Sequence, residues 1–147
     1  MRSRTLASAF LWLAGISGCA TGPHSPVGFR LPETGDVERG RAAFVELECT
    51  RCHSVYKSEL PEYPEERPVH VVLGGLVEGL MTDGYLVSGI INPSHRFGRG
   101  SGEAPVSVEG ESRMPDFSRR MTVRQLIDIV AFLQSKYELA PPHIQGP

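Results

Sequence analysis

Three stretches of the chain show apolar residues at helical spacing. The first runs from Asp36 to Glu48, and the last begins at Thr122, which has Gln125 three positions later as in a capping box. A shorter segment, GYLVSGII, follows Thr82 and Asp83, which can cap a helix, and Asn92-Pro93 stops it. The expected apolar faces are Val37, Gly40, Phe44 and Leu47 in the first helix, and Val123, Leu126, Ile127, Val130, Leu133 and Tyr137 in the last.

The chain between these helices has few periodic positions. Residues 54–68 contain three prolines and four glutamates, and residues 94–120 are rich in Gly, Ser and Arg, so both stretches are predicted to be loops. Short extended pieces are expected in PVHVVLGG and LVEGLMT. The sequence predicts an all-α domain over residues 35–138, with helices at both ends and long loops in the middle, and a Pro-rich tail over residues 139–147.

The amino terminus has the layout of a secretory signal over residues 1–18, with MRSR followed by a short apolar run that ends at Ile16-Ser17-Gly18-Cys19. This ending resembles the bacterial lipobox, which implies that Cys19 carries lipid and starts the mature chain. The alternative is an ordinary cleaved signal with an incidental cysteine. The resemblance implies a protein anchored on the periplasmic side of a bacterial membrane, and Ala20 indicates the outer membrane. Residues 19–34 are Pro- and Gly-rich and predict a flexible linker.

Charge and cysteine content narrow the class of protein. Without the first eighteen residues, 13 basic side chains face 17 acidic ones, which makes a nucleic-acid partner improbable. An exported chain meets an oxidising compartment, and only Cys49 and Cys52 remain beside Cys19. No third cysteine completes a zinc site, and a disulfide that closes so short a loop would stabilise the fold little.

The stretch ECTRCHS therefore carries the chemistry. Cys49 and Cys52 are three positions apart and His53 follows directly, which is the spacing of c-type haem attachment. Two thiols at this spacing can each bind one vinyl group of a porphyrin while the imidazole reaches the iron. A thioredoxin-like dithiol is the rival interpretation, although no βαβ pattern accompanies it.

At this point the chain resembles the class I monohaem cytochromes c. The resemblance covers GRAAFVELECTRCHSV, INPSH, SRMPDF and LIDIVAFLQSKY. It implies one covalently bound haem c, with Cys49 and Cys52 as thioether cysteines, His53 as the proximal iron ligand and Met114 as the distal one. It also implies that Gly40 and Phe44 pack on the final helix, where Phe132 is the matching aromatic.

The residues around Met114 agree with this role, but a rival ligand remains. Met114 lies outside any apolar periodicity and Pro115 fixes the backbone after it, whereas a core methionine more often occupies a helix face. His95 is the alternative distal ligand, and it would lower the reduction potential relative to methionine. The remaining histidines, His24, His70 and His143, are interpreted as solvated residues. Met81 and Met121 are interpreted as methionines that do not bind the iron. Candidate partners of the haem propionates are Tyr85, Asn92, Arg96 and Arg113.

Two departures from the family pattern stand out. The family's Gly-Pro-x-Leu-x-Gly frame fits HVVLGG only with His70 and Val71 in the first two places, and the Val71 carbonyl is then available to accept a bond from the proximal imidazole. The only tryptophan, Trp12, lies in the signal, so no tryptophan can serve a propionate.

We therefore expect a membrane-tethered electron carrier rather than an enzyme, exchanging single electrons with exported redox proteins. Two alternatives stay open. One is the cytochrome subunit of a periplasmic dehydrogenase or sulfur-oxidising enzyme, and the other is a gas-binding haem sensor.

Overall fold

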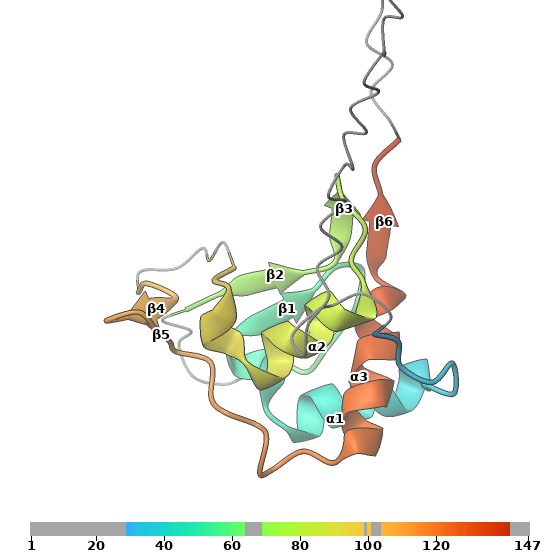
Figure 1. The fold of residues 1–147 in the computed structure, drawn as a ribbon, viewed down its shortest axis with the longest axis horizontal. Helices are drawn as coiled ribbons and strands as arrows, with labels where there is room; N and C mark the ends of the chain where they lie inside the picture. Colours follow the sequence, from blue (N-terminus) through green and yellow to red (C-terminus); the bar gives the residue numbers. More distant parts are fainter. Residues whose placement is uncertain (1–28, 64–68, 99, 101–103, 142–147) are drawn as a thin grey trace, which may run out of the picture.

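Three α-helices form the framework of the molecule (Figure 1). The computed structural model describes residues 29–63, 69–98, 100 and 104–141. Helix α1 (Val37–Glu46), helix α2 (Asp83–Ile91) and helix α3 (Val123–Gln134) match the three predicted segments, and single 3-10 turns follow two of them, η1 (Cys49–Arg51) and η2 (Pro93–His95). The side chains of Asp36, Thr82 and Thr122 cap the helices, and Thr122 with Gln125 forms the predicted capping box.

The prediction of an all-α fold is wrong, because the described residues also contain six short strands and the fold is mixed. Strand β1 (His53–Val55) pairs in parallel with β2 (Val71–Leu73), and β3 (Gly75–Val77) pairs in parallel with β6 (Tyr137–Leu139). Strands β4 (Ser107–Val108) and β5 (Glu111–Ser112) form an antiparallel hairpin. Strands of two or three residues are too short to show an alternation of apolar and polar residues, so periodicity alone does not reveal them. They form because segments that pack together need hydrogen-bond partners for their backbone N–H and C=O groups.

The predicted extended pieces in PVHVVLGG and LVEGLMT are confirmed as β2 and β3. Three positions of the predicted apolar faces are wrong. Val123 is 74% exposed because it is the first residue of α3 and precedes the crossing with α1. Val37 is exposed for the same reason at the start of α1, and Tyr137 lies beyond α3 in β6.

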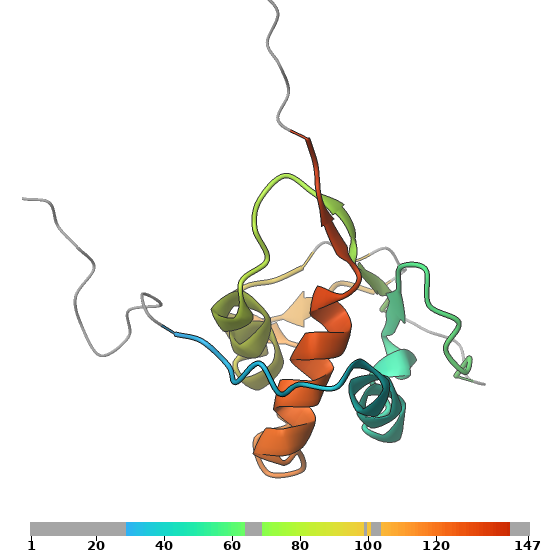
Figure 2. The ribbon, with the colours of Figure 1, turned by 90° about the vertical axis from the view of Figure 1, so that its right-hand side faces the viewer.

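Helices α1 and α3 cross in close contact, and α2 packs on α3 from another side (Figure 2). The crossing is possible because Gly40 has no side chain. A Cβ on Gly40 would collide with the backbone carbonyl of Asp128 and would lie 2.8 Å from the Cβ of Phe132. Phe44, one turn further along α1, packs edge-on against Phe132 with 5.8 Å between ring centroids. The predicted packing of Gly40 and Phe44 on the final helix is confirmed.

A buried carboxylate ties the start of α1 to α3. The Asp128 side chain is buried and accepts hydrogen bonds from the Asp36 backbone N–H at 2.9 Å and from Arg39 Nε at 3.0 Å. The hydrogen bond from Arg39 lowers the pKa of the Asp128 carboxyl, while burial opposes that shift in part. The pair therefore stabilises the folded chain only while Asp128 is ionised.

Several predicted features fall on residues outside the described ranges. They are the signal over residues 1–18, Cys19, His24, His143 and most of the predicted linker and tail. Of the predicted linker, residues from Phe29 onward are described, and there the Leu31 N–H donates to Asp83 Oδ2 at 3.1 Å. Within the described residues no helix is long and apolar enough to cross a membrane.

We expect Gly40→Ala to lower the free energy of unfolding by about 3 kcal/mol, because the added methyl group pushes α1 away from the Asp128 carbonyl. Urea unfolding followed by circular dichroism measures this. Gly79→Ala is the control, since a Cβ there meets no atom within 4 Å, and it should change stability by less than about 0.5 kcal/mol. Equal stability of the two variants would contradict the close crossing.

We expect Asp128→Asn to lower the urea midpoint at pH 7, with the difference from wild type narrowing on acidification. The folded pKa of Asp128 lies below its unfolded value, so its contribution is complete above the unfolded pKa of about 4. That contribution is lost as the pH falls through the lowered folded pKa. Urea midpoints measured from pH 7 to pH 3 test this, with Glu62→Gln as an exposed control; a difference that stays constant with pH would contradict it.

Candidate cofactor site

The two cysteines are separated by a single 3-10 turn at the end of α1. Glu48 ends the helix in the left-handed region with φ of 59°, which redirects the chain into η1. The Cys52 N–H then donates to the Cys49 carbonyl at 3.2 Å and closes the turn. Cys49 and Cys52 are thus about one turn apart along the backbone.

His53 begins β1, and its strand pairing fixes its imidazole. The register of β1 and β2 places His53 opposite Val71, and His53 Nδ1 lies 3.2 Å from the Val71 carbonyl oxygen. Because a carbonyl oxygen only accepts, Nδ1 carries the hydrogen and Nε2 keeps its lone pair. Burial lowers the pKa of His53, which favours the neutral ring. The predicted contact between the His53 imidazole and the Val71 carbonyl is confirmed.

The strand pairing of β1 and β2 needs a backbone N–H at position 71, where the family pattern has a proline. The Val71 N–H donates to the Cys52 carbonyl at 2.8 Å, which continues the parallel ladder towards η1. Proline has no N–H and would lose this bond. Val71 therefore holds the cysteine turn through its N–H and the imidazole through its carbonyl.

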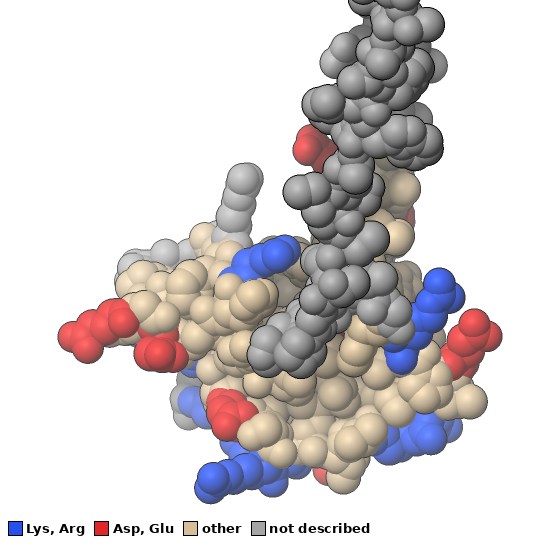
Figure 3. All heavy atoms as spheres, viewed as in Figure 1, with Lys and Arg blue, Asp and Glu red and all other residues tan. Residues whose placement is uncertain are grey.

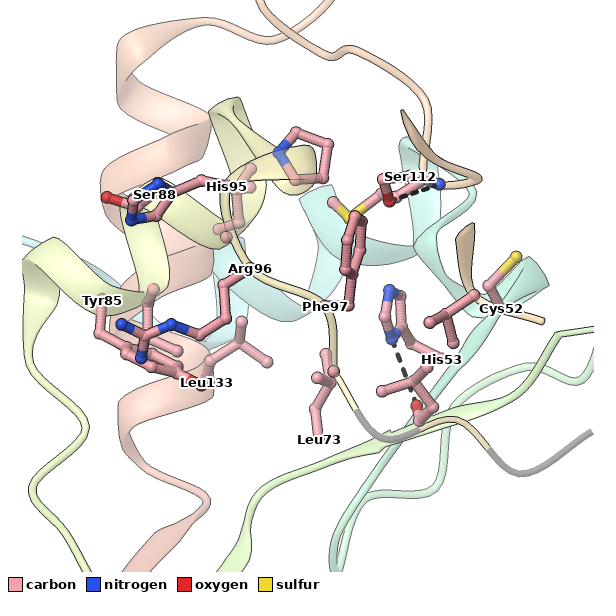
Figure 4. A pocket seen from close by; sticks show the side chains of 18 of the residues that line it. Cys52, His53, Leu73, Tyr85, Ser88, His95, Arg96, Phe97, Ser112 and Leu133 are labelled. Atoms are coloured by element: carbon pink, nitrogen blue, oxygen red, sulfur yellow. Dashed lines mark hydrogen bonds between the residues drawn. The ribbon is translucent and has the colours of Figure 1, made fainter. Parts of the chain in front are cut away.

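A cavity of about 640 Å³ opens in front of His53. Figure 4 shows Cys52 and His53 on one side of it and Tyr85, Ser88 and Arg96 on the opposite side, with the second ring nitrogen of His53 turned away from its hydrogen bond. The volume is within the range of small-molecule and cofactor sites. Apolar side chains from β2, α2 and α3 provide much of the lining, among them Val71, Leu73, Leu86, Ile90 and Leu133.

Met114 is the methionine that borders both this cavity and a smaller hollow beside it. The smaller hollow, about 30 Å³, is lined by Cys49, Phe44 and Met121 among others, and His53 and Met114 line both spaces. Met81 lines only the larger cavity and Met121 only the smaller hollow. The fold thus brings the predicted ligands, His53 and Met114, to one place.

Other predicted site residues divide into two groups. Tyr85, His95, Arg96 and Arg113 line the cavity, and the Arg96 guanidinium stacks over the Tyr85 ring at 4.8 Å. Asn92 is absent from the described lining and instead caps α2 through its backbone. His70 is also absent from that lining, and its Nε2 hydrogen-bonds to Ser54 Oγ at 2.9 Å. The prediction that His70 is merely solvated is therefore incomplete.

Sequence reasoning missed two aromatic residues of the lining, Phe97 and Tyr137. Tyr137 continues the apolar spacing of α3, so the pattern placed it in the helix rather than in β6. Burial raises the pKa of its hydroxyl. Phe97 lies in a stretch without periodicity, and only its aromatic character among Gly, Ser and Arg residues gave any signal.

The environment of the thiols bears on the rival dithiol role. Burial raises the pKa of Cys49 to about 11. A reactive Cys-x-x-Cys pair needs the opposite shift, because the thiolate is its nucleophile. Both cysteines are free in the described structure. The site therefore does not favour thiol–disulfide exchange.

A haem group fits the residues that are present. The cavity offers a neutral imidazole with a free lone pair, a thioether, the Cys52 thiol and a largely apolar lining with two arginines, and the Cys49 thiol borders the smaller hollow beside it. Among the residues that line it in the described structure there is no carboxylate to repel the haem propionates. Among all the residues that the structure describes, no group of three or more His, Cys, Asp or Glu side chains is arranged to hold a metal ion by itself.

Comparison with known proteins adds no assignment: no family model, no curated protein and no solved structure matches the chain.

Proposed function

We propose that this protein is a monohaem c-type cytochrome that carries single electrons between redox partners. Cys49 and Cys52 would hold the haem through thioether bonds, and His53 Nε2 and the Met114 sulfur would ligate its iron. A haem in this cavity supplies one-electron oxidation and reduction of iron.

One observation supports the proposal above all. His53 and Met114 are far apart in the sequence, yet they border the same two adjoining spaces beside the cysteine turn. A histidine that merely fills a core would have no reason to present an unprotonated nitrogen to a cavity of cofactor size. The Val71 carbonyl selects that tautomer and orients the ring, as acceptors behind ligating histidines do.

The residues suit a carrier better than a catalyst. His53 and Met114, one from each of two chain segments, would both bind the iron, so no open position would be left for a substrate. The largely apolar lining would suit a soft thioether ligand, while Arg96 and Arg113 would offer positive charge to the propionates. To carry electrons, the domain must then meet each of its partners. The proposed lipid on Cys19 would hold it at the membrane, and the linker after Cys19 would let it move between them.

Membrane attachment at the periplasmic face, through lipid on Cys19, is part of the same proposal. It is supported by the signal-like start of the chain and by the small residues before Cys19. Without residues 1–18 the formal charge becomes more negative, from −2 to −4, which also fits a protein that meets other proteins rather than nucleic acid.

We expect protein expressed with a haem-attachment system to show a covalent c-type spectrum and the weak near-infrared band of iron bonded to methionine sulfur. Met114→His should keep the haem, lose the band and lower the reduction potential on the order of 100 mV, because imidazole favours ferric iron more than thioether does. Redox titration followed by absorption measures the potential.

Met121→Leu is the matched control, because Met121 borders only the smaller hollow, and it should keep the band. If the Met114 variant kept both band and potential, another residue would be the ligand, with His95 as the first candidate. Binding of carbon monoxide by the reduced native protein would instead support a haem sensor. Absence of covalent haem in the wild type would overturn the proposal.

We expect Cys19→Ala to move the protein from the membrane fraction to the soluble fraction without any change in its absorption spectrum, because the lipid would be the only attachment removed. Fractionation of cells with immunodetection measures this. A variant that still sediments with membranes would contradict anchoring through Cys19.

A further inference from the structure

Met114 directly follows the β4–β5 hairpin, so the hairpin determines where its side chain starts. The hairpin turns at Glu109 and Gly110, whose φ values of 51° and 84° are those of a two-residue type I′ turn. The Arg113 N–H donates to the Val106 carbonyl at 2.9 Å and closes the pair one residue before Met114. A two-stranded hairpin is only marginally stable by itself, so contacts with the rest of the fold must hold it.

Ser94, in the 3-10 turn after α2, makes such a contact. Ser94 Oγ donates to Glu111 Oε2 at 2.7 Å and accepts from the Ser112 N–H at 3.0 Å. Ser112 Oγ in turn accepts from the Met114 N–H at 3.1 Å. Four residues are thus joined in one chain of hydrogen bonds that runs from η2 to the backbone of Met114. Figure 4 shows the Ser112 end of this chain beside the cavity.

The chain joins two parts of the site that the sequence separates. Ser94 lies between Pro93 and His95, which both line the cavity, and the hairpin carries Ser112 and Arg113, which line it from another side. Glu111 is exposed, so its end of the chain is near solvent. Figure 3 shows acidic side chains at the edge of the molecule where Figure 1 places β4 and β5. The Met114 end is packed against the core.

We propose that Ser94, Ser112 and Glu111 are positioning residues that hold the Met114 loop closed and so determine how easily another ligand replaces the methionine sulfur. This inference rests on the proposed haem function. Displacement of Met114 requires its loop to leave the cavity, and movement of the hairpin away from η2 breaks the bonds that Ser94 makes. Each net hydrogen bond changes such an equilibrium about fivefold.

The test is a titration of the oxidised haem-loaded protein with imidazole, followed by loss of the near-infrared band. Ser94→Ala removes both bonds at Ser94 and should lower the apparent Kd for imidazole about 25-fold, the product of two fivefold changes. Ser112→Ala removes the acceptor of the Met114 N–H and should lower it about fivefold, whereas Ser112→Thr keeps the hydroxyl and should restore the wild-type value. Ser107→Ala, in the opposite strand of the same hairpin, is the matched control and should leave the Kd unchanged.

The outcomes separate the two proposals. A wild-type protein that has covalent haem and the band, with imidazole affinity unchanged in the Ser94 and Ser112 variants, would overturn the positioning role alone. The same holds if the Ser107 control shifts as much as they do. If Ser94→Ala fails to accumulate, the Ser112→Ala and Ser112→Thr pair decides the question. A wild-type protein without covalent haem would overturn the proposed function and this inference with it.

Discussion

The close crossing of α1 and α3 at Gly40 is the constraint on which the rest of the structure depends. It lets the α1 backbone reach the Asp128 carbonyl and places Phe44 edge-on against Phe132. The Phe44 ring then lies 6.3 Å from the His53 ring, so the wall behind the imidazole is built from the same contact. Asp128 adds a buried polar tie between the two helices through Arg39 and the Asp36 N–H. Stability and site geometry therefore share one interface.

The short strands position side chains more than they build a core. The pairing of β1 with β2 fixes the tautomer and direction of His53, and the β4–β5 hairpin brings the chain to Met114. The pairing of β3 with β6 holds Tyr137 at the cavity wall. Each pairing is only two or three residues long, so it depends on the helices for support. The short pairings give hydrogen-bond partners to backbone N–H and C=O groups near the cavity. Loops without such pairing would leave these groups unpaired.

The chemistry of the site follows from low polarity as much as from ligand identity. Burial lowers the pKa of His53 and so favours the neutral imidazole, and the Met114 thioether carries no charge. Neutral groups suit a proposed site in which the iron and the propionates would carry the charge. The arginines of the lining, Arg96 and Arg113, are then the natural partners for the anionic groups.

The sequence by itself determined the three helices, their caps and the Cys49, Cys52 and His53 triplet, because helical periodicity, capping residues and ligand spacing are local properties. It also singled out Met114, although the spacing did not exclude His95, which the fold places on the same cavity. Only the tertiary structure decided which short strands pair with one another, the link through Ser94 and the places of Phe97 and Tyr137. Those features arise from pairing between segments far apart in the chain, and two or three residues of each segment are too few to leave a pattern.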